Sequence, residues 1–479
     1  MNVFSTRLAS GILSTVKTKS RDSRPGVSPA RSAAFDILFR VERDSSYASE
    51  LLHSRTYDRV AQADHALAME LVLGVLRWRS LLDSDIVHSS AQPLEKLDLE
   101  VLTALRLAVY QLRQLSRIPA RAAIHESVEL VKRARKRSAA PFVNAVLRKV
   151  AAGIEPIPRS FESSIDGSSV RTLGASSAHP PWLVERWAEA YGLEVALKIC
   201  QYNQSIPVTA IRLRRLDSEV KLRMEGIELA PGALLSSARL VHLGEISRTA
   251  AFRSGFVAIQ DEASQLVAAL VGHAPYALDC CAAPGGKTAA IADRNPDANI
   301  VAVELHPHRA ALLQRLLRPQ PSDQGAGTGK IQIVAADARD LPFAAKFDRV
   351  LADVPCSGTG TLSRNPEIKW RLAYADLADL QQRQLSILRS AMNQVAAGGR
   401  LIYSTCSLEK EENENVIDRA LAQDSSFRVV DCRLELRKLQ HEGELIWPDP
   451  STLTRGCYLR TLPGANACDG FFAAILEKL

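Results

Sequence analysis

The chain has 479 residues, more than one hydrophobic core usually organises, so two to four domains are expected. A hydrophobic content of 46% and a charged content of 24% are typical of a globular protein, and no apolar run of about 18 uncharged residues is present to cross a membrane. The net charge of +7 favours a polyanionic partner.

The cysteines indicate free thiols. The chain has 8 of them and no C-x-x-C pair, and its histidines do not fall at metal-ligand spacing, so we expect no metal site. A chain of this size without a secretory signal is expected to be cytoplasmic, with reduced thiols, and we expect a monomer. Residues 1–30 contain Asp22 as their only acid. This favours a disordered basic tail, although a transit peptide or a start placed too early has the same composition.

Residues 31–151 have a helical pattern throughout. Apolar residues recur at three- and four-residue steps, as from Leu67 to Leu76, and prolines at 93, 119 and 141 separate the helices. An all-α bundle is predicted. It contains a run of cations that is equally typical of a solvated helix end and of a phosphate contact. These candidate RNA-binding residues are Lys132, Arg133, Arg135, Lys136 and Arg137, with Arg148 and Lys149 close behind.

The next hundred residues are expected to form a linker and a small module. Residues 152–178 are rich in Ser, Pro and Gly and lack periodicity, which predicts a linker. Residues 179–256 open with a helical pattern and continue with mixed α/β text. Within them, residues 206–216 read as a strand with alternating arginines. Arg212 and Arg214 are candidates for an RNA phosphate, and a structural use is equally favoured.

From residue 257 to 479 strands and helices alternate, which predicts an α/β domain with a mostly parallel sheet. The expected strands are residues 277–279, 300–303, 331–334, 349–352, 401–403 and 470–476. Helical text separates most of them. Ser404 and Thr405 are expected to end the fifth strand. In such a sheet, ligands bind outside the carboxyl ends of the strands.

The ends of the first four strands carry the features of a nucleoside-binding site. A Gly-rich turn lets backbone approach a cofactor and aims helix N–H groups at it. A P-loop is excluded, because it requires glycine where this chain has Cys281. One acid follows each of the next three strands, and such acids bind ribose hydroxyls or an adenine amino group. The candidate cofactor residues are Cys281, Ala282, Ala283, Pro284, Gly285, Gly286, Lys287, Glu304, Asp337 and Asp353.

Two thiols lie at two of these strand ends. Cys356 lies in Pro355-Cys356-Ser357 after the fourth strand, and Cys406 lies between the fifth strand and the helix expected after it. A lone cysteine is more often a small buried hydrophobe. Two thiols beside a cofactor loop are hard to explain by packing alone, and they favour covalent chemistry.

Here a resemblance becomes specific. The segments P-C-S-G-T-G, R-N-P-E-I-K-W and Y-S-T-C-S-L-E-K-E-E-N-E resemble the RNA cytosine-5 methyltransferases of the RsmB (Sun/Fmu) family. C-A-A-P-G-G-K-T, Q-D-E-A-S and D-G-F-F-A are similar to the same family. The helical front, including F-V-N-A-V-L-R-K at 142–149, resembles the family's NusB-like RNA-binding domain.

The resemblance implies a three-part architecture and a reaction. It implies a NusB-like helical domain, a small middle module and a Rossmann-like methyltransferase domain that binds S-adenosylmethionine. The implied reaction is methylation of C5 of a cytosine in small-subunit (16S) ribosomal RNA. Cys406 would attack the base, Cys356 would assist breakdown of the adduct, Asp353 would hydrogen-bond the cytosine, and Lys287 would support the site.

Three alternatives remain at this point. In DNA cytosine-5 methyltransferases the Pro-Cys cysteine attacks, which would make Cys356 the nucleophile; the Thr-Cys-Ser context of Cys406 favours the RNA arrangement. The NusB-like front also fits a non-catalytic RNA-binding or antitermination factor, which would not need both thiols and all three acids. A related enzyme acting on transfer RNA is the third.

Overall fold

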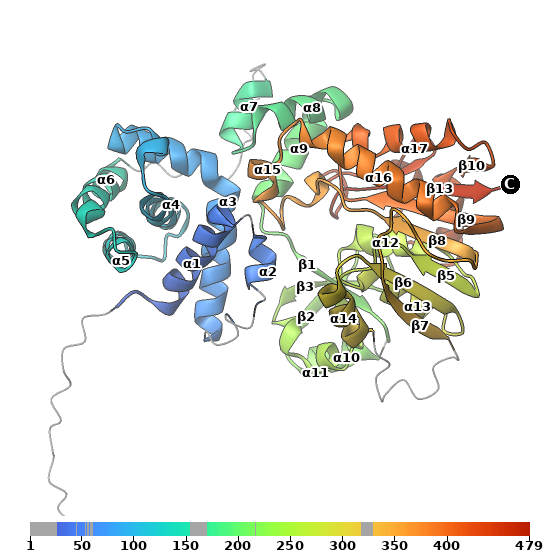
Figure 1. Ribbon diagram of the computed structural model, residues 1–479. Helices are drawn as coiled ribbons and strands as arrows, with labels where there is room; N and C mark the ends of the chain where they lie inside the picture. The colour runs from blue at the N-terminus through green and yellow to red at the C-terminus, as the bar shows by residue number, and fades with distance from the viewer. Residues whose placement is uncertain are drawn as a thin grey trace, which may run out of the picture.

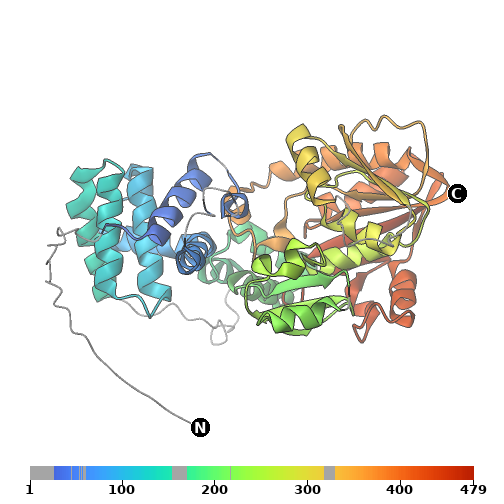
Figure 2. The same ribbon diagram turned by 90° about the horizontal axis from the view of Figure 1, so that it is seen from below.

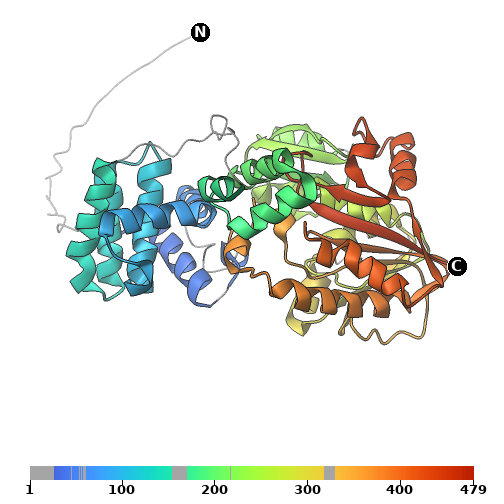
Figure 3. The same cartoon turned by 90° about the horizontal axis from the view of Figure 1, so that it is seen from above.

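The computed structural model describes residues 26–44, 46–52, 54, 57, 61–153, 170–215, 217–317 and 329–479. A helical domain stands at one end of the molecule and a large sheet covered by helices at the other, with α7, α8 and α9 between them (Figure 1). The views from below and above show the same order (Figures 2 and 3). Most of the expected basic tail and of the linker lies outside the described residues. Within them, no helix combines the length and the apolar character that a membrane span needs.

The helical domain is built around α4, in which every residue from Val101 to Gln111 is buried. Helix α1 begins with a proline in its first turn, where the missing N–H group costs no hydrogen bond. The core is formed by apolar residues of α1, α3, α4, α5 and α6. The helices are α1 Pro29–Arg43, α2 Ala48–Leu52, α3 Gln62–Ser90, α4 Leu99–Gln114, α5 Ala120–Arg133 and α6 Ala140–Ala152, with 3-10 turns η1 Leu94–Lys96 and η2 Arg137–Ala139.

The segment after this domain differs from the expected linker. Helix α7, Val170–Ser176, forms inside the Ser-rich stretch, followed by α8 Pro181–Tyr191 and α9 Leu193–Gln204. Trp187 of α8 is buried together with Leu362 and Leu408, which belong to the loops that follow the two thiols. These helices therefore pack against the predicted catalytic loops.

A small antiparallel sheet forms the rest of the middle region. Its order is β2-β3-β1-β4, and Ile211 of β1 pairs with Arg239 on one side and Ile259 on the other. Strand β4 lies beyond residue 256, so the sheet crosses the boundary expected there. The elements are β1 Thr209–Leu213, α10 Ser218–Met224, β2 Glu228–Pro231, β3 Ala238–Leu243, η3 Ile246–Arg248, α11 Ala250–Arg253 and β4 Val257–Ile259.

The large sheet has nine strands in the order β11-β12-β13-β9-β8-β5-β6-β7, with β10 beside β13. Strands β7, β6, β5, β8 and β9 are parallel, and the pairs formed by β10 to β13 are antiparallel. The strands are β5 Tyr276–Asp279, β6 Asn299–Glu304, β7 Lys330–Ala335, β8 Phe347–Asp353, β9 Val395–Thr405, β10 Phe427–Val430, β11 Thr454–Arg455, β12 Tyr458–Thr461 and β13 Phe471–Lys478. Each expected strand is present, but Ser404 and Thr405 extend β9, because β13 and β8 supply partners to that point.

Helices cover both faces of this sheet. One apolar core contains side chains of α12, α13 and α18, namely Leu270, Ile291 and Leu436. The other core contains side chains of α16 and α17, namely Leu388 and Ile417. Strand order reverses at β5, between β6 and β8, which is where ligands bind in such sheets. The remaining helices of this domain are α12 Glu262–Leu270, α13 Gly286–Arg294, α14 Pro307–Leu316, α15 Ile368–Arg371, α16 Asp376–Met392, α17 Glu414–Leu421 and α18 Cys432–His441, with 3-10 turns η5 Thr359–Thr361, η6 Lys410–Glu412 and η7 Pro450–Leu453.

The helical domain docks onto α15. Trp370 Nε1 donates a hydrogen bond to Leu76 O at 2.6 Å, and Lys369 Nζ donates to Arg77 O at 2.9 Å. Glu367 accepts from Ala48 N at 2.8 Å. The R-N-P-E-I-K-W segment thus joins the loop after Cys356 to the helical domain.

Candidate active site

The two predicted catalytic thiols are in contact. Cys356 follows β8 and Cys406 follows β9, and these neighbouring parallel strands bring the Sγ atoms to 3.3 Å. Both side chains are partly buried. The loops that carry them are also joined by backbone, since Gly360 N donates to Cys406 O at 2.9 Å. A Cβ at Gly360 would lie 2.2 Å from Gly470 O, so only glycine fits this close approach.

The environment of Cys356 favours its protonated form. Its hydrogen bond with Cys406, its burial and the nearby Glu412 carboxylate together raise the pKa of Cys356 well above its ordinary value. A thiolate is the attacking form of cysteine. Cys356 is therefore poorly suited to attack first, which weighs against the alternative in which it is the nucleophile.

Lys287 and Asp353 form an ion pair beside the thiols. Lys287 Nζ lies 2.7 Å from Asp353 Oδ2, and Ser404 Oγ donates to Asp353 Oδ1 at 2.7 Å. The Lys287 ammonium also lies 5.0 Å from the centre of the Phe471 ring. Burial alone would lower the pKa of Lys287, but the Asp353 carboxylate outweighs burial and leaves that pKa raised. The site thus keeps a lysine cation and a carboxylate oriented toward each other.

The Gly-rich loop closes the end of β5. Gly285 has φ +108° at the start of α13, and a Cβ there would lie 2.7 Å from Leu313 Cδ1. Asp279, the last residue of β5, accepts hydrogen bonds from Thr288 Oγ1 at 2.7 Å and from Cys281 N at 3.3 Å. Burial raises the pKa of Asp279 to about 6. This buried carboxyl fixes both ends of the loop.

The two remaining acids lie along the same edge. Glu304 ends β6 and is nearly buried; its Oε1 accepts from His306 N at 2.9 Å, whereas Oε2 has no partner among the residues that the structure describes. Asp337 follows β7, and the Arg339 guanidinium lowers the pKa of its carboxyl. The structure therefore brings the predicted cofactor residues together at the carboxyl ends of four adjacent parallel strands. A loop of backbone N–H groups with acids at successive strand ends fits a nucleoside cofactor.

The candidate RNA-binding residues do not share one surface with this site. Arg212 is buried and forms an ion pair with Asp293, and the exposed Arg214 pairs with the same carboxylate. In the helical domain, Lys132 pairs with Glu129, Arg133 with Asp36 and Lys136 with Asp98. Arg135 and Arg137 are exposed and have no ion-pair partner in the described part of the chain. Helix α5, which ends just before them, lies in the helical domain far from the sheet (Figure 1).

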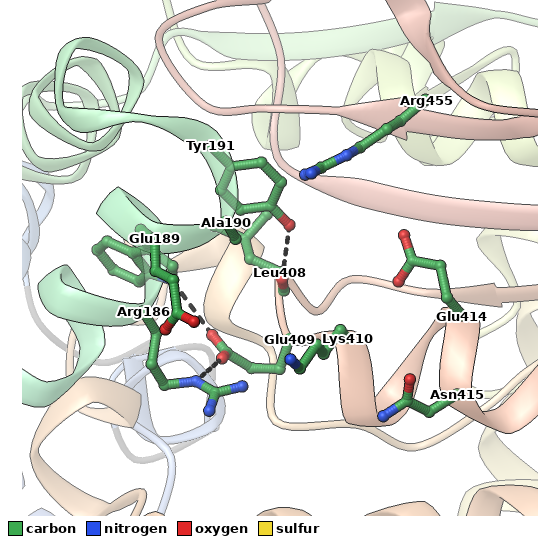
Figure 4. A pocket seen from close by; sticks show the side chains of 11 residues that line it. Arg186, Glu189, Ala190, Tyr191, Leu408, Glu409, Lys410, Glu414, Asn415 and Arg455 are labelled. Atoms are coloured by element: carbon green, nitrogen blue, oxygen red, sulfur yellow. Dashed lines mark hydrogen bonds and ion pairs between the residues drawn. The ribbon is translucent and has the colours of Figure 1, made fainter.

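A cavity of about 380 Å³ lies on the other side of the loop that follows Cys406. Figure 4 shows α8 forming one wall, with Tyr191 donating to Leu408 O at 2.6 Å and Arg186 bound to Glu409 at 2.6 Å. Helix α8 thereby holds the loop that follows Cys406. Within the described residues, no group of three or more His, Cys, Asp or Glu side chains is arranged to hold a metal ion.

Several residues of the site were not predicted from the sequence. Asp279 lies at the Gly-rich loop, and Ser357, Ser407 and Glu412 lie at the loops that carry the two thiols. Arg364 bridges Asp261 and Asp469. The sequence did contain one signal, because Cys356 and Cys406 are each followed directly by serine. Both serines bind the same carboxylate, Glu412.

The comparisons with known proteins agree with this arrangement. Residues 28–152 match the NusB family, and residues 271–477 match the family described as 16S rRNA methyltransferase RsmB/F. The crystal structure of PH0851 superposes with a TM-score of 0.75 at 23% identity, covering 94% of this chain and 99% of that one. NSun6 from Pyrococcus horikoshii with SFG covers 63% of this chain and 99% of its own, with a TM-score of 0.53 at 19% identity. These two likenesses concern the fold.

Fold and site together define a methyltransferase with a NusB-like helical domain. A Bacillus subtilis protein named probable ribosomal RNA small subunit methyltransferase B is 35% identical over 94% of this chain and 98% of its own length. The Vibrio cholerae ribosomal RNA small subunit methyltransferase B is 31% identical over 94% of this chain and 97% of its own. The chain belongs to this family of ribosomal RNA small subunit methyltransferases, which confirms the family and the fold class expected from the sequence.

Proposed function

We propose that this protein transfers a methyl group from S-adenosylmethionine to C5 of a specific cytosine in small-subunit (16S) ribosomal RNA, through a covalent bond between Cys406 and C6. The observation that carries the proposal is the 3.3 Å contact between the Cys356 and Cys406 thiols beside the Lys287–Asp353 pair. Because C5 of cytosine is a poor nucleophile, this methyl transfer needs a thiol that adds to the ring. Membership of the family of ribosomal RNA small subunit methyltransferases supports ribosomal RNA as the substrate. Both thiols must stay reduced, as in the cytoplasm.

Each side chain has a role that its position supports. The Cys406 thiolate bonds to C6, which makes C5 enamine-like and able to accept a methyl group. Asp353 and Lys287 hydrogen-bond the polar edge of the base and stabilise the charge that develops on the ring. After transfer, a base removes the C5 proton and the C5–H electrons restore the C5–C6 double bond. The C6–S bond breaks, and its electron pair returns to the Cys406 sulfur as thiolate. Cys356, held against Cys406, assists this last step.

The cofactor supplies a methyl group on a positively charged sulfur. The loop from Cys281 to Lys287 provides backbone N–H groups, with the Gly285 turn allowing the close approach. Glu304, whose Oε2 is without a partner in the described part of the chain, would accept from ribose hydroxyls. Asp337 would receive the adenine amino group, and Asp353 completes the set.

The RNA must present an unstacked base to this pocket, as base-modifying enzymes require. The chain would bind it as a monomer, with phosphate contacts from the helical domain. Arg135 and Arg137 are the strongest of the predicted contacts, since the structure gives them no carboxylate partner among the described residues.

The test follows radiolabelled methyl transfer from S-adenosylmethionine to ribosomal RNA by wild type, Cys406→Ala and Cys356→Ala, with covalent protein–RNA adducts scored on denaturing gels. We expect Cys406→Ala to abolish both transfer and adduct, and Cys356→Ala to accumulate adduct. Adduct that survives in Cys406→Ala but disappears in Cys356→Ala would reverse the two roles. Transfer to transfer RNA instead of ribosomal RNA would change the substrate, and no transfer to any RNA would favour a binding factor.

A further inference from the structure

The loops that carry the two thiols share one buried carboxylate. Glu412, at the end of η6, is fully buried. Its Oε1 accepts from Ser357 N at 2.8 Å and from Gln384 Nε2 at 2.8 Å. Its Oε2 accepts from the hydroxyls of Ser357 and Ser407. These serines directly follow Cys356 and Cys406, so one side chain binds the residue next to each thiol.

All four donors to this carboxylate are neutral. Among the described residues, no lysine or arginine lies within ion-pair distance of Glu412; the nearby Arg460 pairs with Glu414 instead. A buried charge without a cation is costly unless hydrogen bonds compensate it, and hydrogen bonds to a charged group are the stronger kind. The arrangement therefore forms a rigid hydrogen-bonded junction between the two loops. Apolar side chains at this place would avoid the cost of burying a charge.

The junction sets the distance between the loops. Ser357 Oγ lies 3.0 Å from Ser407 Oγ, and the Sγ atoms of the two preceding cysteines lie 3.3 Å apart. We propose that Glu412 is a positioning residue for methyl transfer, which holds the Cys356 loop and the Cys406 loop so that the two thiols act on the same base. This role rests on the proposed function, but the geometry it claims can be measured without RNA.

The charge of Glu412 adds a second effect on Cys356. The groups that act on the Cys356 thiol are Cys406 at the end of β9, Glu412 from η6 and the backbone of Gly358, whose hydrogen bond lowers the pKa. Tyr403 of β9 also interacts with this thiol. The hydrogen bond with Cys406 and burial are the larger influences that raise the pKa of Cys356, and Glu412 adds to them. Glu412 thus helps to keep Cys356 protonated while Cys406 attacks.

Two substitutions separate these effects. In Glu412→Gln the carbonyl oxygen can still accept from Ser357 N and Gln384, and the new amide can donate to the two serine hydroxyls, so the junction persists without its charge. Glu412→Ala removes the junction. The matched control is Glu411→Gln on the same turn, whose carboxylate binds Arg186 on α8 and touches neither serine.

The first measurement is the effective concentration of the two thiols against glutathione. One oxidised glutathione and the two cysteine thiols give one Cys356–Cys406 disulfide and two reduced glutathiones, so two electrons and two protons pass to glutathione. Peptide mapping identifies the disulfide. We expect Glu412→Ala to lower the effective concentration about tenfold or more, because several hydrogen bonds to a charged group are lost, and Glu412→Gln and Glu411→Gln to stay near wild type.

The second measurement follows alkylation of Cys356 by iodoacetamide against pH in a Cys406→Ala background. Adding Glu412→Gln should move the midpoint to lower pH, because a nearby negative charge is removed, whereas Glu411→Gln should not. In methyl transfer, Glu412→Ala should lower kcat with little change in KM, and Glu412→Gln should restore most of the rate.

An effective concentration in folded Glu412→Ala equal to wild type would overturn the positioning role, whatever the activity. If Glu412→Ala does not fold, Ser357→Ala, which removes one hydroxyl donor, takes its place with the same direction expected. If the effective concentration falls as stated but wild type methylates no cytosine, the positioning of the thiols stands and the proposed function fails.

Discussion

At the scale of single residues, this site gives different tasks to chemically identical groups. Asp353 is bound to the Lys287 ammonium, whereas Asp279 has only neutral donors and a pKa raised by burial to about 6. The neighbouring Cys406 and burial likewise raise the pKa of the Cys356 thiol. Placement relative to charge and water, and not residue type, distinguishes the roles.

Asp279 makes the stability of the methyltransferase domain depend on pH. Its folded pKa of about 6 lies above the ordinary aspartate value of 3.8, so the folded state binds the proton more tightly. Its stabilising contribution is therefore complete below about pH 4 and is lost as pH rises through about 6. This difference between the folded and the ordinary pKa of Asp279 corresponds to roughly 3 kcal/mol. Asp279→Asn should exceed wild type in stability by up to that amount near pH 7.5, and the difference should disappear near pH 4.

Chemical denaturation of both proteins from pH 4 to 8 checks this expectation. Asp340→Asn is the control, because that side chain is exposed and should leave the pH dependence unchanged. A difference between Asp279→Asn and wild type that stays constant over the whole range would contradict the assignment.

At the scale of elements, the short helix α15 links catalysis to the helical domain. It lies a few residues after the Cys356 loop, and three of its side chains donate to backbone carbonyls of the helical domain. Arg364, just before it, bridges Asp261 of the Q-D-E-A-S segment and Asp469 of the D-G-F-F-A segment. The segment therefore fixes the Cys356 loop from both sides.

Trp370→Phe tests this docking with a small change. It keeps an aromatic ring and removes the hydrogen bond from Nε1 to Leu76 O. A net loss of about 1 kcal/mol is expected at the interface, which corresponds to roughly fivefold faster amide exchange in α15 and α2. Hydrogen exchange followed by mass spectrometry measures it. Trp447→Phe is the matched control, because its indole donates to Thr452 inside the α/β domain. Equal effects of the two substitutions on α2 would contradict docking through α15.

Most helices and strands of the fold could be predicted from the sequence, but the contacts between them could not. Strands β5 to β9 could be predicted because each is a short apolar run that ends in a chemically distinctive residue. The end of β9 was missed because Ser404 and Thr405 look like a stop until β8 and β13 supply partners. Helix α7 was missed for a similar reason. Its Ser-rich sequence has few apolar residues, and these are buried only by packing against α8 and α9.

The candidate site shows the same division. The thiols, the Gly-rich loop and the acids carry their own local signals, and the parallel topology then brings them together. The pairing of Arg212 and Arg214 with Asp293 could not be predicted, because that acid is about 80 residues away in the chain. Glu412 could not be found without the structure, since an acid in an acidic run looks like a solvated helix cap until its burial is known.

At the scale of the whole molecule, the net charge is +7, but only some of the cations are free to bind a polyanion. Many of the cations are in ion pairs, including three of the five in the predicted run. Arg135 and Arg137 are exposed between α5 and α6, and Arg148 and Lys149 are exposed toward the end of α6. None of the four has an ion-pair partner among the residues described. The helical domain stands at the end of the molecule away from the sheet (Figures 2 and 3). RNA that contacts these cations and the thiols together must extend along the molecule.

Removing unpaired cations should therefore weaken RNA binding more than removing paired ones. The double variant Arg135→Ala/Arg137→Ala should reduce the magnitude of the slope of log affinity against log salt by about 1.4 to 1.8, because each phosphate contact contributes about 0.7 to 0.9. The matched double variant Lys132→Ala/Lys136→Ala loses the same charge, but its cations are already neutralised by Glu129 and Asp98, so less than half the change is expected. Binding measured over a range of salt concentrations gives both slopes. The single-turnover rate at saturating RNA should stay the same in both, since neither pair lies at the thiols. Equal slope changes in the two variants would show that the helical domain does not select its RNA contacts by charge availability.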